Sequence, residues 1–316
     1  MTWTLLALPP VPQELVVPLF GDLDVTLLPL PERTQDAVEA LLPQADLVLA
    51  DWSPQLQVTH AGPRVCFVQQ PSVGYDGVDA DALAREGVPL ATCAGANTTS
   101  VAEWCLSATL ALLRRTLAAD TAVRAGSWPQ TQIGGQELAG RRVGVVGMGP
   151  IGHATARLFA AFGCDVAYWS RSRHADAPVP YAELDDLLAH SDVVVLVVAL
   201  GPQTRGLVDA RRLKKGALLV NGARGEVVDE PALLEALAAD HLGGAALDVF
   251  AVEPLPADSP LRDAPRVLLS PHMAGSTAQA AGRIVAQATA NLRRVLAGEP
   301  VVDVVNGVDP LVRRRV

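Results

Sequence analysis

Long apolar runs are missing from this sequence of 316 residues. None approaches the roughly 18 consecutive apolar residues that a membrane-spanning helix needs, so we expect no membrane partner. The first ten residues, MTWTLLALPP, contain no basic segment and reach Pro9 too early for a secretory signal peptide. These two absences predict a cytoplasmic protein.

Cysteine is also scarce, and the few cysteines are scattered. They have mostly apolar neighbours and form no CxxC pair, which predicts buried, reduced thiols rather than disulfides or a metal site. A reducing compartment fits this usage. The four residues are Cys66, Cys93, Cys105 and Cys164.

Positive charge is in short supply as well. Lys plus Arg total 25 against 34 Asp plus Glu, so the formal net charge is -9. Such a chain is repelled by phosphate backbones and anionic lipid, which excludes nucleic acid as the main partner. Codon usage is a sufficient explanation for an excess of arginine in which only Lys214 and Lys215 are lysines.

The remaining composition indicates a compact protein with two domains. Apolar residues make up 50% of the chain and charged residues 19%, which is enough for two buried cores. At roughly 150 residues per domain, the length favours two domains over one. Residues 1–97 contain the short apolar runs LLAL, DVTLL, DLVLA, RVCFVQ and VPLATC, with candidate helices at 33–42 and 80–86. This pattern predicts a small parallel α/β unit.

A long apolar helix is predicted after this unit. Ser100 and Glu103 form a capping-box signature in front of a helix of some twenty residues, which either forms a spine between domains or contributes an oligomer contact. From residue 142 onward, strands and helices alternate regularly, as in the Rossmann-type doubly wound parallel sheet. We expect the closing helix, 276–297, to pack back on the first unit.

The strongest local motif is a GxGxxG sequence between a predicted strand and a predicted helix. In this context Gly147 permits a tight turn, Gly149 lets the backbone approach a pyrophosphate, and Gly152 lets helix and strand pack closely. The motif therefore predicts a dinucleotide site rather than an ordinary glycine-rich turn. Its residues are Gly147, Met148, Gly149, Pro150, Ile151 and Gly152.

The end of the next strand indicates which dinucleotide is bound. A carboxylate at this position binds the ribose 2′-OH of NAD, but the strand 165–169 is followed by Ser170, Arg171, Ser172 and Arg173. Hydroxyls and guanidinium groups suit a 2′-phosphate. We therefore favour NADP(H), with NAD(H) possible; alternatively, the two arginines only decorate a solvated turn.

Three polar residues follow the carboxyl ends of predicted strands, where open α/β sheets bind ligands. Arg224 can grip a planar carboxylate with two hydrogen bonds. His272 can exchange a proton near neutral pH, and Glu253 beside it would fix its tautomer and favour the imidazolium. Each residue alone has a structural explanation, but with a dinucleotide fold they suit hydride chemistry on a keto acid.

Five ordered motifs together resemble those of the D-2-hydroxyacid dehydrogenase family over nearly the whole chain. They are SVGYDGVD (72–79), VGVVGMGPIG (143–152), NGARGEVVDEPAL (221–233), ALDVFAVEPLP (246–256) and PHMAGST (271–277). The resemblance implies a dinucleotide-binding domain at 98–283. It also implies a discontinuous, flavodoxin-like substrate domain at 1–97 and 284–316, and a homodimer joined largely through the nucleotide domain and the long helix, here 101–115.

The resemblance also implies roles for individual residues. Arg224 would bind the substrate carboxylate and carbonyl, His272 would be the general acid in reduction, and Glu253 would orient and charge His272. Backbone N–H groups of the Val73–Gly74 turn would hold the carboxylate, and Asp248 would contact the nicotinamide carboxamide. The substrate would be a small 2-keto or 2-hydroxy acid.

Within the family, the sequence favours NADPH-linked glyoxylate or hydroxypyruvate reductases because of the turn 170–173. Formate dehydrogenases are expected to pair the histidine with glutamine rather than Glu253, and phosphoglycerate dehydrogenases often carry an added regulatory domain, which we do not expect in a chain ending at 316. The alternative is a dinucleotide-sensing, corepressor-like binding protein. Pocket shape would depend on residues near Trp52, Val73, Tyr75 and Ala96, whereas Trp104 and Trp128 are expected to pack.

Overall fold

The computed structural model describes residues 2–10, 23–53 and 55–315. The chain forms two compact units, Met1–Asn97 with Ala278–Val316, and Thr98–Thr277. Our predicted boundary at 283/284 lies inside the closing helix, α9 (Ala278–Ala297), whereas the observed division falls at the start of this helix. The continuous helix belongs to one unit because its apolar residues pack along the sheet of that unit.

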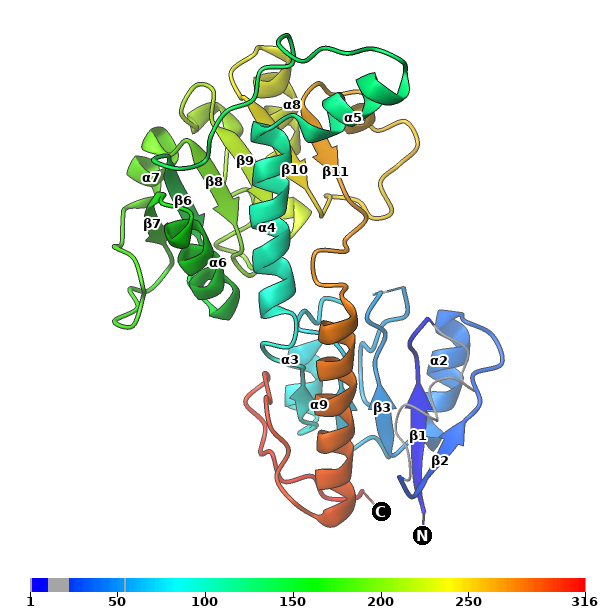
Figure 1. Cartoon of the computed structure of the whole chain (residues 1–316). Helices are drawn as coiled ribbons and strands as arrows, with labels where there is room; N and C mark the ends of the chain where they lie inside the picture. The colour runs from blue at the N-terminus through cyan, green and yellow to red at the C-terminus, as the bar shows by residue number, and fades with distance from the viewer. Residues whose placement is uncertain (1, 11–22, 54, 316) are drawn as a thin grey trace. The chain divides into compact units, whose positions relative to one another are not determined.

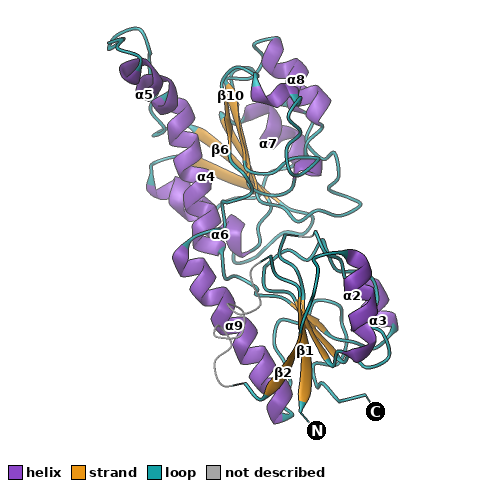
Figure 2. Cartoon of the chain, turned by 90° about the vertical axis from the view of Figure 1, so that its right-hand side faces the viewer, coloured by secondary structure: helices purple, strands orange, loops and turns teal. Residues whose placement is uncertain are grey.

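The unit formed by the two ends of the chain is built on a parallel sheet with strand order β2-β1-β3-β4-β5. This is the flavodoxin-like order. Helix α9 covers one face of the sheet, and α2 (Gln35–Leu41) and α3 (Ala80–Arg85) cover the other (Figure 2). The strands are β1 (Trp3–Ala7), β2 (Val25–Leu28), β3 (Leu47–Leu49), β4 (Phe67–Gln69) and β5 (Leu90–Ala91).

The closing helix belongs to this unit, as predicted. Its side chains Ala288, Leu292 and Val295 share one apolar core with Leu5 and Phe67 of the sheet. Burying each large aliphatic side chain contributes about 1.5–3 kcal/mol, so the helix contributes substantially to the stability of a sheet whose strands come from the other end of the chain.

The second unit contains a parallel sheet with strand order β11-β10-β9-β8-β6-β7. A parallel bridge between Tyr168 and Tyr181 adds a rudimentary strand beyond β7. With this bridge counted, the first six strands have the order 3-2-1-4-5-6 of the Rossmann fold, so the predicted fold class is confirmed. The strands are β6 (Arg142–Val146), β7 (Asp165–Trp169), β8 (Val193–Leu196), β9 (Leu218–Asn221), β10 (Gly244–Leu247) and β11 (Val267–Leu269).

Helices cover both faces of this sheet, which explains why its strands read as continuous apolar runs. Within β8, Val193 and Val195 pack with α4 (Thr98–Leu113) and α6 (Pro150–Ala161). Val194 and Leu196 pack on the other face with α7 (Leu184–His190) and α8 (Glu230–Ala238). Figure 1 shows α4 and α6 in front of the strands.

The long helix after residue 97 differs from the prediction. α4 begins at Thr98, so Ser100 is inside the helix and is not its cap; its buried hydroxyl lies 2.8 Å from that of Thr277. The helix ends at Leu113, whose carbonyl accepts a hydrogen bond from the Gln136 N–H. Arg115 then adopts a left-handed conformation (φ 50°), and a separate helix, α5 (Thr116–Arg124), follows.

Two further expectations can be compared with the described residues. Cys66, Cys93 and Cys105 are buried free thiols, as predicted, whereas the free thiol of Cys164 is half-buried rather than buried. In the described part of the chain, no helix combines the length and the apolar character that crossing a membrane requires.

Candidate active site

The turn between β6 and α6 has the geometry that a dinucleotide requires. Gly147 has φ 106°, and a Cβ there would lie 2.8 Å from the backbone of Val197. A Cβ on Gly152 would collide with the carbonyl oxygen of Gly147, whereas a Cβ on Gly149 would meet open space. Because α6 starts at Pro150, the N-terminal N–H groups of the helix and its partial positive charge adjoin this open space. The residues present therefore fit a pyrophosphate.

The Ser-Arg turn after β7 divides into buried and exposed parts. Ser170 is buried, and its hydroxyl donates to the carbonyl of Ser172 at 2.5 Å. The hydroxyl proton is therefore used within the turn, so the Ser170 oxygen can only accept a hydrogen bond from a ligand. Arg171 and Ser172 are exposed.

Arg173 is exposed but contacts two neighbouring side chains. Its guanidinium lies 4.3 Å from the centroid of the Tyr181 ring and 3.3 Å from a carboxylate oxygen of Glu183. The Tyr181 hydroxyl donates to the same carboxylate at 3.2 Å. Both arginines were predicted to bind the phosphate. In the structure, Arg173 contacts Tyr181 and Glu183, whereas Arg171 is exposed to solvent.

The loop after β9 positions Arg224. Asn221 is buried, its Oδ1 accepts the Ala223 N–H at 3.0 Å, and its Nδ2 donates to the carbonyl of Arg224 at 3.0 Å. A Cβ on Gly225 would collide with the carbonyl carbon of Phe250, so glycine is needed for the loop to pack against the segment after β10. The Arg224 guanidinium also donates to the Ala223 carbonyl at 2.7 Å.

His272 and Glu253 form a hydrogen-bonded pair. Nδ1 of His272 lies 2.7 Å from Oε2 of Glu253, and Oε1 of the carboxylate accepts the Phe250 N–H at 3.0 Å. When Glu253 is ionised, the proton of this hydrogen bond is on Nδ1. Nε2 is then the nitrogen that can exchange a proton with a ligand. The imidazole is 48% exposed, so Nε2 is accessible to a ligand.

The environment of Glu253 keeps its carboxylate ionised. Burial acts to raise its pKa, but hydrogen bonds from His272 and the Phe250 N–H, with the charges of His272 and Arg224, outweigh burial and lower the pKa below its ordinary value. The positive charge of Arg224 acts on the Glu253 pKa in the same direction as that of His272. The three residues predicted as catalytic therefore form one electrostatic group.

Asp248 organises the backbone that carries His272. Its Oδ1 accepts the Ser270 hydroxyl at 2.5 Å and the Met273 N–H at 2.9 Å, and its Oδ2 accepts the Ala274 N–H at 2.7 Å. Its carbonyl accepts the His272 N–H at 2.8 Å. His272 has φ 51°, a left-handed conformation that is uncommon for a residue with a side chain, and these bonds hold it there.

In the other unit, the predicted carboxylate-binding turn follows β4. Ser72 donates from its hydroxyl to the Gly74 carbonyl at 2.6 Å and accepts from Nε2 of Gln70 at 2.7 Å. Gln70 is buried and also donates to the Asp51 carbonyl at 3.3 Å. Among the residues that the structure describes, no acceptor meets the N–H of Val73 or of Gly74. Two adjacent donors are thus available to an anion.

Residues 106–274 match the family model described as "D-isomer specific 2-hydroxyacid dehydrogenase, NAD binding domain". The chain belongs to the D-2-hydroxyacid dehydrogenase family. A glyoxylate reductase of Thermofilum pendens is 38% identical over 255 residues, which cover 77% of this chain and 75% of that protein. A D-3-phosphoglycerate dehydrogenase of Mycobacterium bovis is 38% identical over 300 residues, 92% of this chain and 56% of that protein.

The last comparison shows that this D-2-hydroxyacid dehydrogenase family member spans little more than half the length of the phosphoglycerate dehydrogenase that it matches. The solved NAD-dependent formate dehydrogenase of Staphylococcus aureus in complex with NAD is 28% identical, with a TM-score of 0.83 and coverage of 95% of this chain and 97% of that chain. Our reason for setting phosphoglycerate dehydrogenases aside does not hold, because their identity equals that of the glyoxylate reductase.

Several supporting residues of this D-2-hydroxyacid dehydrogenase fold escaped the sequence analysis. Asn221, Ser270, Ser72 and Gln70 carry no reactive group, and only their places at strand ends could have drawn attention to them. The tryptophans differ from one another: Trp104 packs in the core beside Gly222, but Trp128 is 77% exposed and does not pack as expected. Of the residues expected to shape the pocket, Trp52 and Tyr75 are exposed, Val73 is partly exposed, and Ala96 is buried.

Proposed function

We propose that the protein is an NAD(P)-dependent oxidoreductase that reduces a small 2-keto acid to the 2-hydroxy acid. The observation that carries this proposal is the 2.7 Å contact between His272 and Glu253, in a unit that also holds Arg224 and the dinucleotide turn. A proton donor, a carboxylate-binding cation and a hydride carrier are the three components that such a reduction needs.

In this mechanism a bound reduced nicotinamide would supply the hydride. His272 holds a proton on Nε2 and delivers it to the carbonyl oxygen as negative charge develops there. Glu253 accepts a hydrogen bond from Nδ1–H, and its negative charge favours the imidazolium form of His272 before the Nε2 proton is transferred. Arg224 orients the substrate carboxylate and offsets charge in the transition state.

The proposal divides binding between the two units, each of which the structure describes by itself. In one unit, the N–H groups of Val73 and Gly74 would donate to a substrate carboxylate. In the other unit, Arg224 would bind the carboxylate or the carbonyl of the substrate. The six residues 147–152 would hold the pyrophosphate, and Asp248 would use its remaining acceptor position for the nicotinamide carboxamide. The glyoxylate reductase relative supports glyoxylate as substrate, because the similarity extends over three quarters of that protein; hydroxypyruvate is proposed as the second small acid.

We also propose a preference for NADP(H) over NAD(H). The support is local: the carboxylate that selects NAD is replaced by Ser170 at the end of β7, and Arg171 is exposed next to it. Asp165 lies at the opposite end of that strand.

A homodimer is proposed for the whole protein. Residues 101–115 largely face their own sheet, but apolar side chains follow them on the surface: Leu117 is 58% exposed, Val123 51% and Trp128 77%. Light scattering on the purified protein tests the oligomeric state.

A spectrophotometric assay tests the function. Loss of NADPH absorbance is followed with glyoxylate, hydroxypyruvate, pyruvate, 3-phosphohydroxypyruvate and a bulkier 2-keto acid, and each assay is repeated with NADH. Turnover with a small acid is expected, whereas preferred turnover of the phosphorylated acid would reassign the substrate. Absence of turnover with every acid, combined with dinucleotide binding, would favour a dinucleotide-sensing, corepressor-like binding protein instead.

The general-acid role has its own test. His272→Ala should remove most turnover while leaving NADPH binding nearly intact, since no predicted dinucleotide contact involves this imidazole. An equal loss of dinucleotide affinity would contradict the role.

A further inference from the structure

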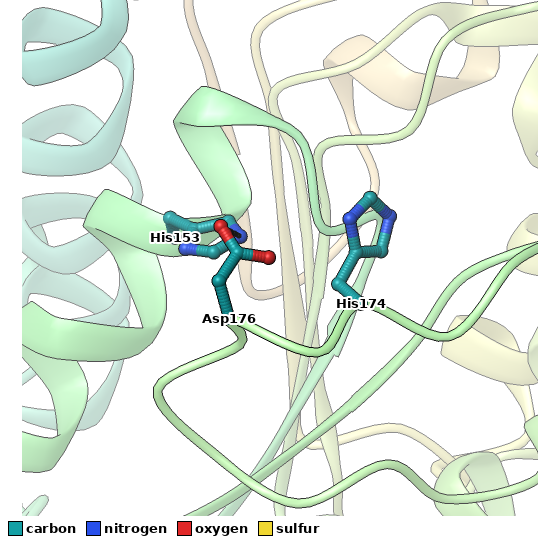
Figure 3. Close-up of side chains that lie close together, drawn as sticks. All are labelled: His153, His174 and Asp176. Atoms are coloured by element: carbon teal, nitrogen blue, oxygen red, sulfur yellow. Dashed lines mark ion pairs between the residues drawn. The ribbon is translucent and has the colours of Figure 1, made fainter.

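Three side chains with metal-binding atoms meet outside the proposed active site. His153 projects from α6 toward the loop that follows β7, and His174 and Asp176 belong to that loop (Figure 3). One ligand atom from each residue can be chosen so that all three lie within 4.8 Å of one another. No step of the proposed reduction uses these residues.

The His153 imidazole and the His174 backbone have restricted positions, whereas the His174 side chain is exposed. His153 is on a regular helix, and its imidazole is only 17% exposed. The backbone of His174 is held at both ends by one phenol, because the buried Tyr168 hydroxyl accepts the His174 N–H at 2.8 Å and donates to its carbonyl at 3.3 Å. The rings of His153 and His174 lie edge to face with centroids 6.2 Å apart.

The third ligand can move. Oδ2 of Asp176 lies 3.9 Å from Nε2 of His153, and the side chain of Asp176 is 82% exposed. Ligand atoms around a tetrahedral zinc ion, each about 2.1 Å from the metal, lie roughly 3.4 Å apart. Rotation of the two exposed side chains, the Asp176 carboxylate and the His174 ring, would therefore have to shorten separations of up to 4.8 Å to about 3.4 Å around an ion.

We propose that His153, His174 and Asp176 bind a zinc ion. Two imidazoles and a carboxylate form a borderline nitrogen and oxygen donor set, which suits Zn²⁺ better than Mg²⁺ or Ca²⁺. The three ligands leave a fourth position for water or an anion. The ion would tie the loop 170–176 to the helix that begins at the dinucleotide turn.

Other histidines provide a comparison within the same chain. His190 lies 2.9 Å from Asp186, and His60 lies 3.3 Å from Glu39. Each is a surface pair of one imidazole and one carboxylate. In the described ranges, the cluster at His153 is the only one in which three such groups come together. The third donor is the feature that separates it from ordinary ion pairs.

Titration of the EDTA-treated, dialysed protein with zinc chloride alone tests this site. Calorimetry should show one ion per chain with a dissociation constant of about 10 µM or tighter. His153→Asn and His174→Asn should each weaken binding at least tenfold, and Asp176→Asn should weaken it several-fold. Cobalt chloride should give the strong visible bands of a tetrahedral ion in the wild-type protein and not in the two histidine variants.

His190→Asn is the matched control, because it removes an imidazole from a histidine–carboxylate pair and should leave zinc affinity unchanged. His272→Asn excludes binding at the His272–Glu253 pair. Circular dichroism checks that the variants are folded. A wild-type dissociation constant weaker than about 100 µM, or folded His153→Asn and His174→Asn variants that bind zinc as well as the wild type, would overturn the proposal.

Discussion

Both oxygens of the Glu253 carboxylate are committed: Oε2 lies 2.7 Å from Nδ1 of His272, and Oε1 accepts the Phe250 N–H at 3.0 Å. The backbone contact fixes the carboxylate, and the carboxylate in turn fixes the imidazole. His272 is fixed a second time through its main chain, which donates to the Asp248 carbonyl at 2.8 Å. The orientation of His272, the proposed proton donor, thus depends on two adjoining segments of the same unit.

Glu253→Gln should change the pH dependence of reduction. The glutamine oxygen can still accept a hydrogen bond from Nδ1–H, but the amide lacks the negative charge that favours the imidazolium. We expect kcat near neutral pH to fall by about 10- to 100-fold and the alkaline limit of the rate profile to move to lower pH. Initial rates between pH 5 and 9 measure both effects.

The control for this variant is Glu226→Gln. Glu226 is also partly buried and pairs with Arg205 at 3.5 Å, but no described contact joins it to His272. A Glu253→Gln profile that coincides with the wild-type profile would show that the carboxylate only orients the ring.

The same variant predicts a pH dependence of stability. The pKa of Glu253 is lowered in the folded protein, so its contribution to the free energy of unfolding is fully present above the pKa of the unfolded chain, about 4.5. It is lost as the pH falls through the folded-state value. Urea unfolding should therefore show a wild-type advantage over Glu253→Gln at pH 7 that shrinks below pH 4.5; a gap independent of pH would contradict this.

Arg171→Ala and Arg173→Ala should have different effects. A charge-assisted hydrogen bond to a 2′-phosphate contributes about 1.5–3 kcal/mol, so Arg171→Ala should raise the KM for NADPH at least tenfold and leave that for NADH nearly unchanged. Arg173→Ala removes a contact with Tyr181 and Glu183 and should affect both dinucleotides alike, through the loop. Steady-state kinetics with each cofactor separate the two cases.

The opposite results would be informative for the cofactor. If Arg171→Ala changes both KM values equally, this arginine does not recognise the phosphate and the NADP(H) preference has lost its main support. If Arg173→Ala is the variant that selectively weakens NADPH, the stacking on Tyr181 is released on binding.

Features that depend on a few consecutive residues could be predicted from the sequence, whereas features that depend on contacts with other segments could not. Apolar runs and the glycine spacing indicated the two parallel sheets and the phosphate turn, because each requirement is contained within a few consecutive residues. The break at Arg115 depends on Gln136, which takes the Leu113 carbonyl from a distant part of the chain. The capping pattern at Ser100 failed for the same reason, since its hydroxyl pairs with Thr277.

The candidate site shows the same division. Arg224, Glu253 and His272 were identifiable from their chemistry and their places after strands. The contact between the Arg173 guanidinium and the Tyr181 ring could not be identified from the sequence. It depends on a segment that forms only a single bridge to β7. Asn221 and Gln70 hold other residues in place through hydrogen bonds. Their roles can be recognised only when the structure shows which groups they contact.

The cysteines should be almost inert in the folded protein. Burial raises the pKa of Cys66 to about 11 and of Cys93 to about 12, and it also raises the pKa of Cys105 and Cys164. At pH 8 few of these groups are thiolates, the reactive form. Ellman's reagent should therefore react quickly with at most one thiol, the half-buried Cys164, and with all four in guanidinium chloride; two or more fast thiols would show that a core opens.

Ser72→Ala should weaken substrate binding through the turn beside it. The Ser72 hydroxyl is the link between Gln70 and the Gly74 carbonyl, at 2.7 and 2.6 Å. This hydroxyl therefore ties down the turn whose Val73 and Gly74 N–H groups meet no acceptor among the described residues. Loss of one such hydrogen bond costs about 1–2 kcal/mol, so we expect the KM for the keto acid to rise about tenfold, with little change in the KM for the dinucleotide.

Two variants make this expectation specific. Ser72→Thr keeps the hydroxyl and should restore most of the affinity for the keto acid. Ser53→Ala removes a hydroxyl at the same edge of the sheet, where it donates to Asp51 at 2.7 Å, without touching the turn, and should leave the KM unchanged. An equal rise in KM for Ser53→Ala and Ser72→Ala would mean that general loosening of this edge, rather than the hydrogen bond from Ser72 to the Gly74 carbonyl, controls binding.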